Sequence, residues 1–411
     1  MSPPADLLTT TSAAASADVA TFTAAIRARV RESGAWRKVR RALADDQLPL
    51  AIEGPQAGYL PFFAADVMAA AGAPLLVVVP TEQEAEALVA DLTLLAGVDA
   101  LHFPWWGTLP YAAASPLPAV FGRRADVLAT LAHDPAGRRV VVVSLRALST
   151  PVPPATYLRR RVLELTPGME LDPVAVEEQL VSFGYIRVPR VSVHGEFSVK
   201  GEVIDVYPHG HDHAIRAVLE FDSIDELRSF DPLSQASVAE EPACRIHPVR
   251  EVHIAGPELQ RLEAAMKESR LPPEESATFL EAVSRDPDAR GAEAFYPLCV
   301  EAVQLTELLG PEACLLLSDA ERLEAAAGAL RKEYTELYRQ AVRDGRFGPM
   351  PKSFLLDYRG LVDAHRRRLS VHSLKGGPGE ERPRIACDGP RSFFGNVAYL
   401  KDELNRLVEL E

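Results

Sequence analysis

Short, almost purely apolar runs separated by helix-like segments constrain the fold of this chain most strongly. Residues 75–79 read LLVVV and residues 140–143 read VVVV. Runs of this length bounded by turn residues indicate strands buried on both faces, as in parallel sheets. Strand-like segments at 49–54 and 100–104 alternate with stretches that have helical spacing. We therefore expect an α/β fold built from three βα repeats, with a parallel, doubly wound sheet of the nucleotide-binding kind.

The segment after the first predicted strand stands where a phosphate-binding loop would lie. Such a loop needs a Gly-rich turn for phosphate, a Lys for the outer phosphate oxygens and a Ser or Thr for magnesium. Here Tyr59 stands at the Lys position, Leu60 at the hydroxyl position, and Glu53 adds a negative charge. The degenerate nucleotide loop consists of Glu53, Gly54, Gly58, Tyr59 and Leu60, with Asp319 as the one candidate metal ligand after a later strand. We expect no cofactor, no metal and no enzyme activity from these 411 residues.

A second pattern, a helix followed by antiparallel strands, covers residues 174–231. Apolar residues recur at helical spacing over 173–183, behind an Asp cap and a first-turn Pro. Extended segments follow at 197–199 and 203–207, the sequence HGHDH (209–213) predicts a hairpin turn, and a strand returns over 215–221. The expected unit is a helix packed on a small antiparallel sheet, an α+β domain.

Cations and one aromatic residue gather at the start of this second pattern. Arg187, Arg190 and Lys200 lie near Phe197 in the sequence. Arginine and aromatic residues are enriched in the hot spots of protein interfaces, so we predict a docking surface on the exposed face of the sheet. The alternative is that Phe197 is a core residue and that the cations only solvate a strand surface.

Two further groups of residues admit a functional interpretation and a structural one. Trp105 and Trp106 could stack on bases, but beside prolines they are expected to plug a sheet edge or a domain boundary. His209, His211 and His213 could bind a metal, but a solvated turn is the favoured interpretation because no fourth ligand is near in the sequence.

Composition limits the classes of function. A formal net charge of -14 disfavours nonspecific binding to a phosphate backbone by this chain alone. The four cysteines are far apart and form no CxxC motif, as expected in a reducing compartment. Neither a leader peptide nor an apolar run long enough to span a membrane is present in the sequence, so we expect a cytoplasmic protein.

Several long stretches resemble a known family. The segment HFPWWGTLPYAAASP (102–116) is similar to a motif of the bacterial transcription-repair coupling factor family (Mfd). The segment GYIRVPRVSVHGEFSVKGEVIDVYP (184–208), with FDSIDELRSFDPLSQ and RIHPVREV after it, resembles both that family and the excision-repair helicase UvrB. The resemblance implies a helicase-like domain with degenerate motifs that is interrupted by an inserted UvrA-binding domain. It also implies a parent protein that is an ATP-dependent DNA translocase and displaces stalled RNA polymerase.

The resemblance also implies which residues face the partner. UvrB-type domains carry an arginine two positions after an aromatic residue, as Arg187 follows Tyr185 here, and Lys200 matches the second of two basic residues on a later strand. Ser198 stands at the first of those two positions, so one contact of the UvrB type is missing. The UvrA-facing set implied by the resemblance is Arg187, Phe197 and Lys200, with Arg190 as a weaker member.

We expect five segments along the chain. They are a disordered tail (1–17), the first part of the helicase-like domain (18–153), the inserted UvrA-binding domain (154–245), the return of the helicase-like domain (246–330) and a small α/β piece (331–411). A final helix with Val397, Leu400, Leu404 and Leu407 on one side lacks a following strand, and the family's motor and polymerase-binding domains lie further along. We therefore expect the chain to be a fragment or a truncated relative, with RNA polymerase and DNA contacted through missing domains.

Two functional hypotheses follow from the sequence. The first is a non-catalytic module of a transcription-repair coupling factor that recruits UvrA during transcription-coupled nucleotide excision repair. The second is a nucleic-acid-dependent ATPase of the UvrB kind with an unorthodox nucleotide loop.

Overall fold

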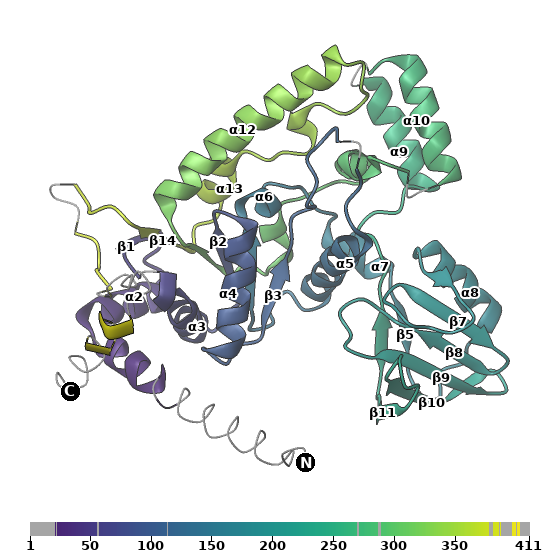
Figure 1. Cartoon of the computed structure of the whole chain (residues 1–411), viewed down its shortest axis with the longest axis horizontal. Coiled ribbons are helices and arrows are strands. Elements are labelled where there is room, and N and C mark those ends of the chain that lie inside the picture. Colours follow the sequence, from purple (N-terminus) through teal and green to yellow (C-terminus); the bar gives the residue numbers. More distant parts are fainter. Residues whose placement is uncertain are drawn as a thin grey trace.

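The structure is a computed structural model, and it describes residues 21 and 23–402, except 56, 113, 269–270, 287–288, 378–380, 386, 388–396 and 400. One of its two six-stranded sheets is parallel between all paired neighbours (Figure 1). The strands in order across the sheet are β1 (Leu50–Glu53), β14 (Arg368–His372), β13 (Cys314–Leu317), β2 (Leu75–Val79), β4 (Val140–Ser144) and β3 (Ala100–Phe103). This confirms the predicted parallel α/β fold.

Helices cover both faces of this sheet, which explains why its central strands are almost entirely apolar. In β2, Leu75 and Val77 pack into the core on one face, and Leu76 and Val78 pack into the core on the other. The first core is covered by α2 (Gly34–Ala44), α3 (Leu60–Ala71) and α4 (Glu82–Leu94). The second is covered by α5 (Pro118–His133), α6 (Leu145–Leu148), α7 (Ala155–Arg160), α12 (Ala320–Arg343) and α13 (Tyr358–Ala364). Successive strand residues point to opposite faces, so the central strands β2, β4 and β13 are buried at every position, whereas β1, β3 and β14 are only partly buried.

The strand β14 corrects the predicted division of the chain. The sequence suggested a separate α/β piece over 331–411, but β14 pairs with both β1 and β13 inside the main sheet. Its Leu369 and Val371 are buried in the core of that sheet. The boundary at 331 is therefore wrong, because this segment completes the first domain. The predicted tail (1–17) and most of the final helix lie outside the described residues.

The second unit is an inserted α+β domain between α7 and the helical segment that follows. Its sheet has the order β11-β10-β9-β8-β7-β6, and a separate β5–β12 pair joins the two ends of the insertion. Its elements are β5 (Leu163–Leu165), α8 (Pro173–Ser182), β6 (Ile186–Arg187), β7 (Glu196–Lys200), β8 (Val203–Val206), β9 (Ala214–Glu220), β10 (Ser223–Phe230), β11 (Ser237–Glu240) and β12 (Cys244–Ile246). The preceding α7 packs in the first domain through Leu158, so the predicted start at 154 is too early.

The inserted domain confirms the expected helix on a sheet and corrects two details. Asp172 caps α8 by accepting a hydrogen bond from the backbone N–H of Val174. The segments predicted at 197–199 and 203–207 are β7 and β8, and Gly201 between them, with φ of +60°, lies in a two-residue hairpin turn and not in a bulge. Phe221 does not share the buried face of β9, since it lies in the next turn and is 87% exposed.

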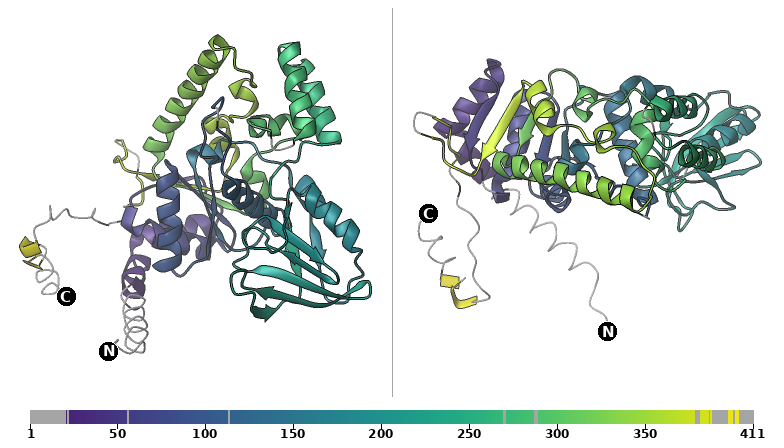
Figure 2. Two further views of the ribbon diagram at one scale, coloured as in Figure 1. Left: turned by 45° about the vertical axis from the view of Figure 1, so that its right-hand side comes forward. Right: turned by 90° about the horizontal axis from the view of Figure 1, so that it is seen from above.

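The HGHDH loop packs against the first domain and is not simply a solvated turn. A Cβ on Gly122 of α5 would lie 2.1 Å from Nδ1 of His209, so this glycine makes room for the imidazole. A Cβ on Gly210 would likewise lie 2.1 Å from Oδ1 of Asp126, also on α5. The inserted domain therefore contacts one helix of the sheet domain at close range (Figure 2).

A helical segment returns the chain from the inserted domain to the sheet. It contains α9 (Pro257–Glu268), α10 (Pro273–Arg285) and α11 (Tyr296–Cys299) around a core of its own. The sequence pattern predicts a helix over 257–269, which α9 confirms, and the acidic residues over 272–290 favour a loop, where the structure instead has α10. Trp106 joins this core through ring contacts with Phe121 and Tyr296, which confirms its predicted place at a domain boundary.

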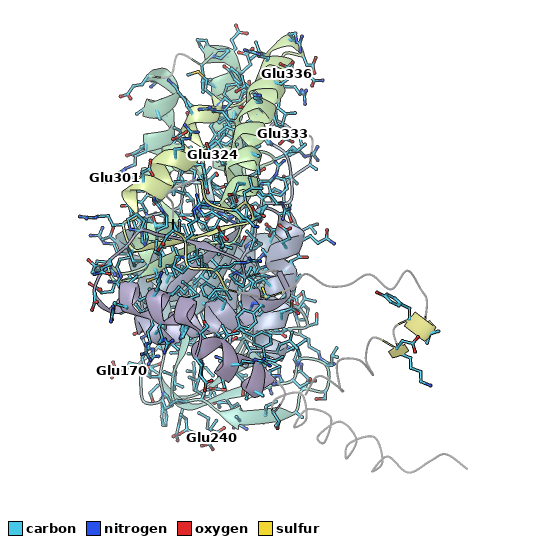
Figure 3. All side chains as sticks on the ribbon, turned by 90° about the vertical axis from the view of Figure 1, so that its left-hand side faces the viewer. Glu170, Glu240, Glu301, Glu324, Glu333 and Glu336 are labelled. Carbon is cyan, nitrogen blue, oxygen red and sulfur yellow. The ribbon has the colours of Figure 1, made fainter. Side chains whose placement is uncertain are left out.

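Carboxylates lie at both ends of the molecule, and many of them are paired. Figure 3 labels Glu324, Glu333 and Glu336 along α12, and Glu170 and Glu240 in the inserted domain at the opposite end. Those on α12 form ion pairs with nearby arginines, such as Glu333 with Arg146. Among the described residues, no helix combines the length and hydrophobicity that crossing a membrane requires.

Candidate functional site

The predicted docking surface loses its aromatic member. Phe197 on β7 has no exposed surface and packs in the core of the inserted domain with Leu180 and Val206. Strand alternation places it on the side of the sheet that α8 covers. The expectation that Phe197 belongs to an exposed UvrA-facing set is therefore wrong, and the alternative that it is a core residue is correct.

Arg187 lies on β6, the edge strand of the inserted sheet. Its side chain is 55% exposed and forms an ion pair with Glu177 of α8. Arg187 pairs in register with Phe197, so it shares the α8 side of the sheet. The helix ends immediately before β6, where Gly184 adopts φ of +86° and Tyr185 donates its backbone N–H to the carbonyl oxygen of Leu180. This tight connection fixes the edge strand beside the helix.

Arg190 and Lys200 lie on the opposite side of the sheet from Arg187. Arg190 donates to the carbonyl oxygen of Leu233 at 2.7 Å, across the turn between β10 and β11. Lys200 is exposed at the end of β7, and it alternates with Val199, which packs on the buried side. Ser198, two positions before Lys200, is buried on the same side of the sheet and donates its hydroxyl to the carbonyl oxygen of Pro189 at 3.5 Å. Arg187 therefore lies at the β6 edge, Lys200 at the end of β7 and the guanidinium of Arg190 beside the β10–β11 turn, and the three cations do not form one cluster.

Exposed aliphatic side chains accompany these cations, and the sequence analysis did not single them out. Val174 and Val181 on α8 are 64% and 54% exposed, and Ile186 and Val193 near the edge strand are 66% and 58% exposed. Val174, Glu177 and Val181 recur at helical spacing, which is the available sequence signal that they share a face. An edge strand with exposed aliphatic and cationic side chains has the composition of a protein-binding surface.

The second candidate region is a cavity of about 410 Å³ beside the degenerate nucleotide loop. It lies where the β1, β2, β13 and β14 strands end, which is where open α/β sheets bind ligands. Its walls include Glu53, Gly54, Leu60 and Asp319, together with Glu84 and Arg322. Arg322 donates to Glu84 at 2.8 Å, so this cation is already engaged.

Tyr59 does not line this cavity. It is 8% exposed, packs in the first core beside Phe62 and lies near the buried carboxylate of Asp66. Burial raises the pKa of Tyr59, and the negative charge of Asp66 raises it further by a smaller amount. Asp66 accepts hydrogen bonds at 2.5 Å from both Arg27 and Arg31. The residue at the Lys position of the loop is therefore a packed core side chain.

Glu53 forms hydrogen bonds to a later segment of the chain (376–385), which lies beside the degenerate nucleotide loop where a ligand would approach it. Its carboxylate accepts a hydrogen bond from the N–H of Gly376 at 2.9 Å, and its backbone bonds to Pro383 and Ile385. A Cβ on Gly54 would lie 2.5 Å from the carbonyl oxygen of Ile385. Asp319 caps α12 by accepting from the N–H of Arg322 at 3.0 Å. The two carboxylates are therefore engaged in holding the fold.

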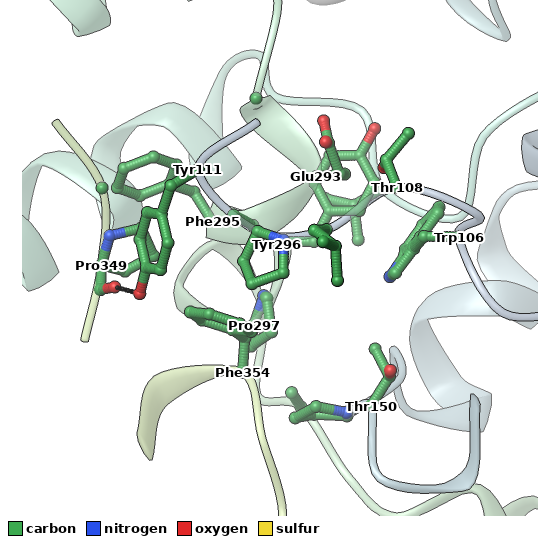
Figure 4. Close-up of a pocket in the computed structure, with 18 of the residues that line it drawn as sticks. Trp106, Thr108, Tyr111, Thr150, Glu293, Phe295, Tyr296, Pro297, Pro349 and Phe354 are labelled. Atoms are coloured by element: carbon green, nitrogen blue, oxygen red, sulfur yellow. Dashed lines mark hydrogen bonds between the residues drawn. The ribbon is translucent and has the colours of Figure 1, made fainter. Parts of the chain in front are cut away.

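A separate cavity of about 300 Å³ is walled by the TLPY part of the motif at 102–116 (Figure 4). The residues that line it come from three segments: Trp106 and Tyr111 from this motif, Tyr296 from the helical segment and Phe354 from the chain after α12. The hydroxyl of Tyr111 donates to the carbonyl oxygen of Pro349 at 2.6 Å. Together these contacts join the helical segment and the chain after α12 to the sheet domain.

Comparisons with known proteins agree with this arrangement. The UvrB interaction domain family matches residues 163–251, which begin at β5 and end just beyond β12. A transcription-repair-coupling factor of Borreliella burgdorferi is 24% identical over 337 residues, which cover 82% of this chain and 29% of that protein. Over much of its length the chain is thus similar to transcription-repair-coupling factors, and its inserted domain matches the UvrB interaction domain.

Two shorter matches are closer in identity. The transcription-repair-coupling factor of Mycobacterium tuberculosis is 36% identical over 174 residues, which cover 41% of this chain and 14% of that protein. The UvrABC system protein B of Edwardsiella ictaluri is 34% identical over 133 residues, which cover 31% of this chain and 19% of that protein. The chain thus spans less than a third of the length of these relatives.

Proposed function

We propose that this chain is a non-catalytic module that recruits UvrA in transcription-coupled nucleotide excision repair. The observation that supports this most directly is the match of the UvrB interaction domain family to the inserted domain, whose edge strand carries exposed Arg187. Lys200, exposed at the end of the neighbouring strand β7, adds a second positive charge to this part of the domain. In a chain of net charge -14, exposed cations on this domain favour a partner surface that bears carboxylates.

The sheet domain then serves as the support for the inserted domain. Its nucleotide loop has a core tyrosine at the Lys position, and Glu53 is bonded to Gly376. These features favour a domain that holds its shape without nucleotide. By analogy with the coupling factors, we also propose that further domains displace RNA polymerase and translocate along DNA. The proposed location of the protein is the cytoplasm.

Binding of purified UvrA to the 411-residue chain, measured by calorimetry, tests the proposal. We expect Arg187→Glu combined with Lys200→Glu to weaken binding by at least about tenfold, because reversing two charges replaces attraction by repulsion. The matched control reverses two exposed cations on α12, Arg331 and Lys332, and should leave the Kd unchanged. Undiminished binding by the double variant of the inserted domain would refute the assignment of this surface.

Thermal unfolding with and without Mg-ATP separates this function from a UvrB-like ATPase. A working site at saturating nucleotide should add roughly 3 kcal/mol to the free energy of unfolding and raise Tm by several degrees. We expect no rise in Tm. A clear rise accompanied by ATP turnover would favour the ATPase.

A further inference from the structure

One side of the β6 edge carries an ion pair framed by exposed aliphatic residues. Val174, Glu177 and Val181 lie on one face of α8, and Arg187 lies on the edge strand beside it. We call these four residues the Arg187 patch. The side chain of Arg187 is 55% exposed and that of Glu177 is 28% exposed, so the ion pair lies at the surface with its guanidinium accessible.

We propose that Glu177 competes with the partner for Arg187 and thereby lowers the affinity of this surface. The inference rests on the proposed function, in which UvrA presents a carboxylate to Arg187. Glu177 already holds the Arg187 guanidinium, so the partner's carboxylate has to replace it. When it does so, the released Glu177 also repels the incoming negative charge. The carboxylate of Glu177 thus lowers the affinity of Arg187 for the partner's carboxylate.

The other two cations are not held in this way. Arg190 donates to a neutral carbonyl oxygen, that of Leu233. Lys200 has no ion pair within the described part of the chain. Each can therefore receive a partner's carboxylate without first releasing one of its own. Arg187 is the member of the set whose contribution depends on an exchange, and Glu177 is the residue that determines it.

The expected effect is modest and measurable. Exposed ion pairs shift equilibria by up to about fivefold. We expect Glu177→Gln to lower the Kd for UvrA by about two- to fivefold, since glutamine keeps the size of the side chain and removes the competing charge. The gain should shrink at high salt, because screening weakens both the internal ion pair and its replacement.

Glu178 offers a matched control. It is the next residue on α8, it is exposed, and neither an ion pair nor a side-chain hydrogen bond of it is found among the described residues. Glu178→Gln changes the net charge of the chain by the same amount as Glu177→Gln. A difference in Kd between these two variants therefore reports competition at Arg187 and not the general effect of one negative charge.

A double-mutant cycle on the whole 411-residue chain tests the inference. The variants are Glu177→Gln, Glu178→Gln, Arg187→Gln and the double variant at 177 and 187, each checked for an unchanged Tm and titrated with UvrA by calorimetry. We expect Arg187→Gln to weaken binding, Glu177→Gln to tighten it, and Glu177→Gln to have no effect when Arg187 is already replaced.

The outcomes separate the two proposals. If Arg187→Gln weakens binding but Glu177→Gln tightens it no more than Glu178→Gln does, the competition is refuted and the recruitment function stands. If Glu177→Gln tightens binding equally without Arg187, the competition at Arg187 is also refuted. If Arg187→Gln has no effect on binding, Arg187 is not in the interface, and both the inference and the assigned surface fail. If the unaltered chain does not bind UvrA, the recruitment function itself is refuted.

Discussion

Arg124 lies in the middle of α5 with its side chain fully buried. It donates to the carboxylate of Glu251 at 2.8 Å and to the carbonyl oxygen of Pro104 at 2.7 Å. Its guanidinium also lies about 4 Å above the rings of Phe103 and Trp106. Burial raises the pKa of Glu251, and the charge of Arg124 opposes that rise. A single residue therefore joins α5, the end of β3 and the chain that leaves the inserted domain.

Replacing Arg124 by alanine should destabilise the protein strongly. The change leaves the buried carboxylate of Glu251 without its cation, and losing one partner of a buried ion pair costs about 3–5 kcal/mol. Urea unfolding followed by circular dichroism measures the loss. The control is Arg123→Ala, since Arg123 is the exposed neighbour and its loss should change the free energy of unfolding by less than about 0.5 kcal/mol. Equal effects of the two substitutions would contradict the assigned role.

The burial of individual residues could be predicted only in part. Arg124 lies three positions after Phe121 and four before Leu128, both buried, so helical spacing does contain the signal for its inward position. The sequence gives no comparable signal for Phe197, because alternation along a strand shows that two faces differ without showing which one α8 covers. The cations at 187, 190 and 200 are exposed or partly paired, as expected for a surface, but their division between two faces depends on pairing that the local sequence does not specify.

At the scale of elements, the contact between the HGHDH loop and α5 should make the protein sensitive to acid. Burial lowers the pKa of His209, in this loop, to about 4, and it does the same to His247, which follows β12 and lies 5.5 Å, ring centre to ring centre, from His133 at the end of α5. Burial raises the pKa of Asp126, on the facing side of α5, to about 6. Between pH 4 and 6 the unfolded chain therefore binds two more protons at the histidines and one fewer at the aspartate. The net difference of one proton means that stability falls as the pH falls.

We expect the free energy of unfolding to decrease by about 2 kcal/mol between pH 6.5 and pH 4.5 from these groups, at about 1.4 kcal/mol for each proton and pH unit. Urea unfolding at several pH values measures the decrease. Protonation of Asp126 stabilises the folded protein as the pH falls, and Asp126→Asn removes this contribution. The free energy of unfolding of this variant should therefore decrease roughly twice as much over the same pH range. His209→Asn should flatten the dependence. A steeper loss in the His209 variant than in the Asp126 variant would contradict this account.

Most elements of the sheet domain could be predicted because their signals are local. The segments that the sequence analysis assigned as strands, at 49–54, 75–79, 100–104 and 140–143, all form strands of the parallel sheet. The helix α10 was missed because its acidic residues suggested a loop, although Phe279, Leu280 and Val283 recur at helical spacing. The place of β14 between β1 and β13 could not be predicted, because strand order in a parallel sheet depends on contacts between distant segments.

At the scale of the whole molecule, β14 determines whether the two domains can be separated. The strand bonds to a neighbour on each side and buries Leu369 and Val371, so the sheet domain needs it. The inserted domain has its own core, and β5 pairs with β12 to bring its two ends together. A chain that ends after Ala364 should therefore unfold in the sheet domain and keep the inserted domain folded. The loss of each buried aliphatic side chain lowers the free energy of unfolding by about 2–5 kcal/mol. The loss of both therefore approaches the whole free energy of unfolding of a typical domain.

Hydrogen exchange followed by mass spectrometry measures both domains in one experiment. In the chain ending after Ala364, we expect protection to be lost in β1, β2 and β13 and to be retained in β7 to β10. The control ends after Leu374, keeps β14 and should protect both domains. If the shorter chain protects its main sheet as well as the control does, the segment after α12 is dispensable, and the predicted boundary at 331 would describe the protein better than the six-stranded sheet does.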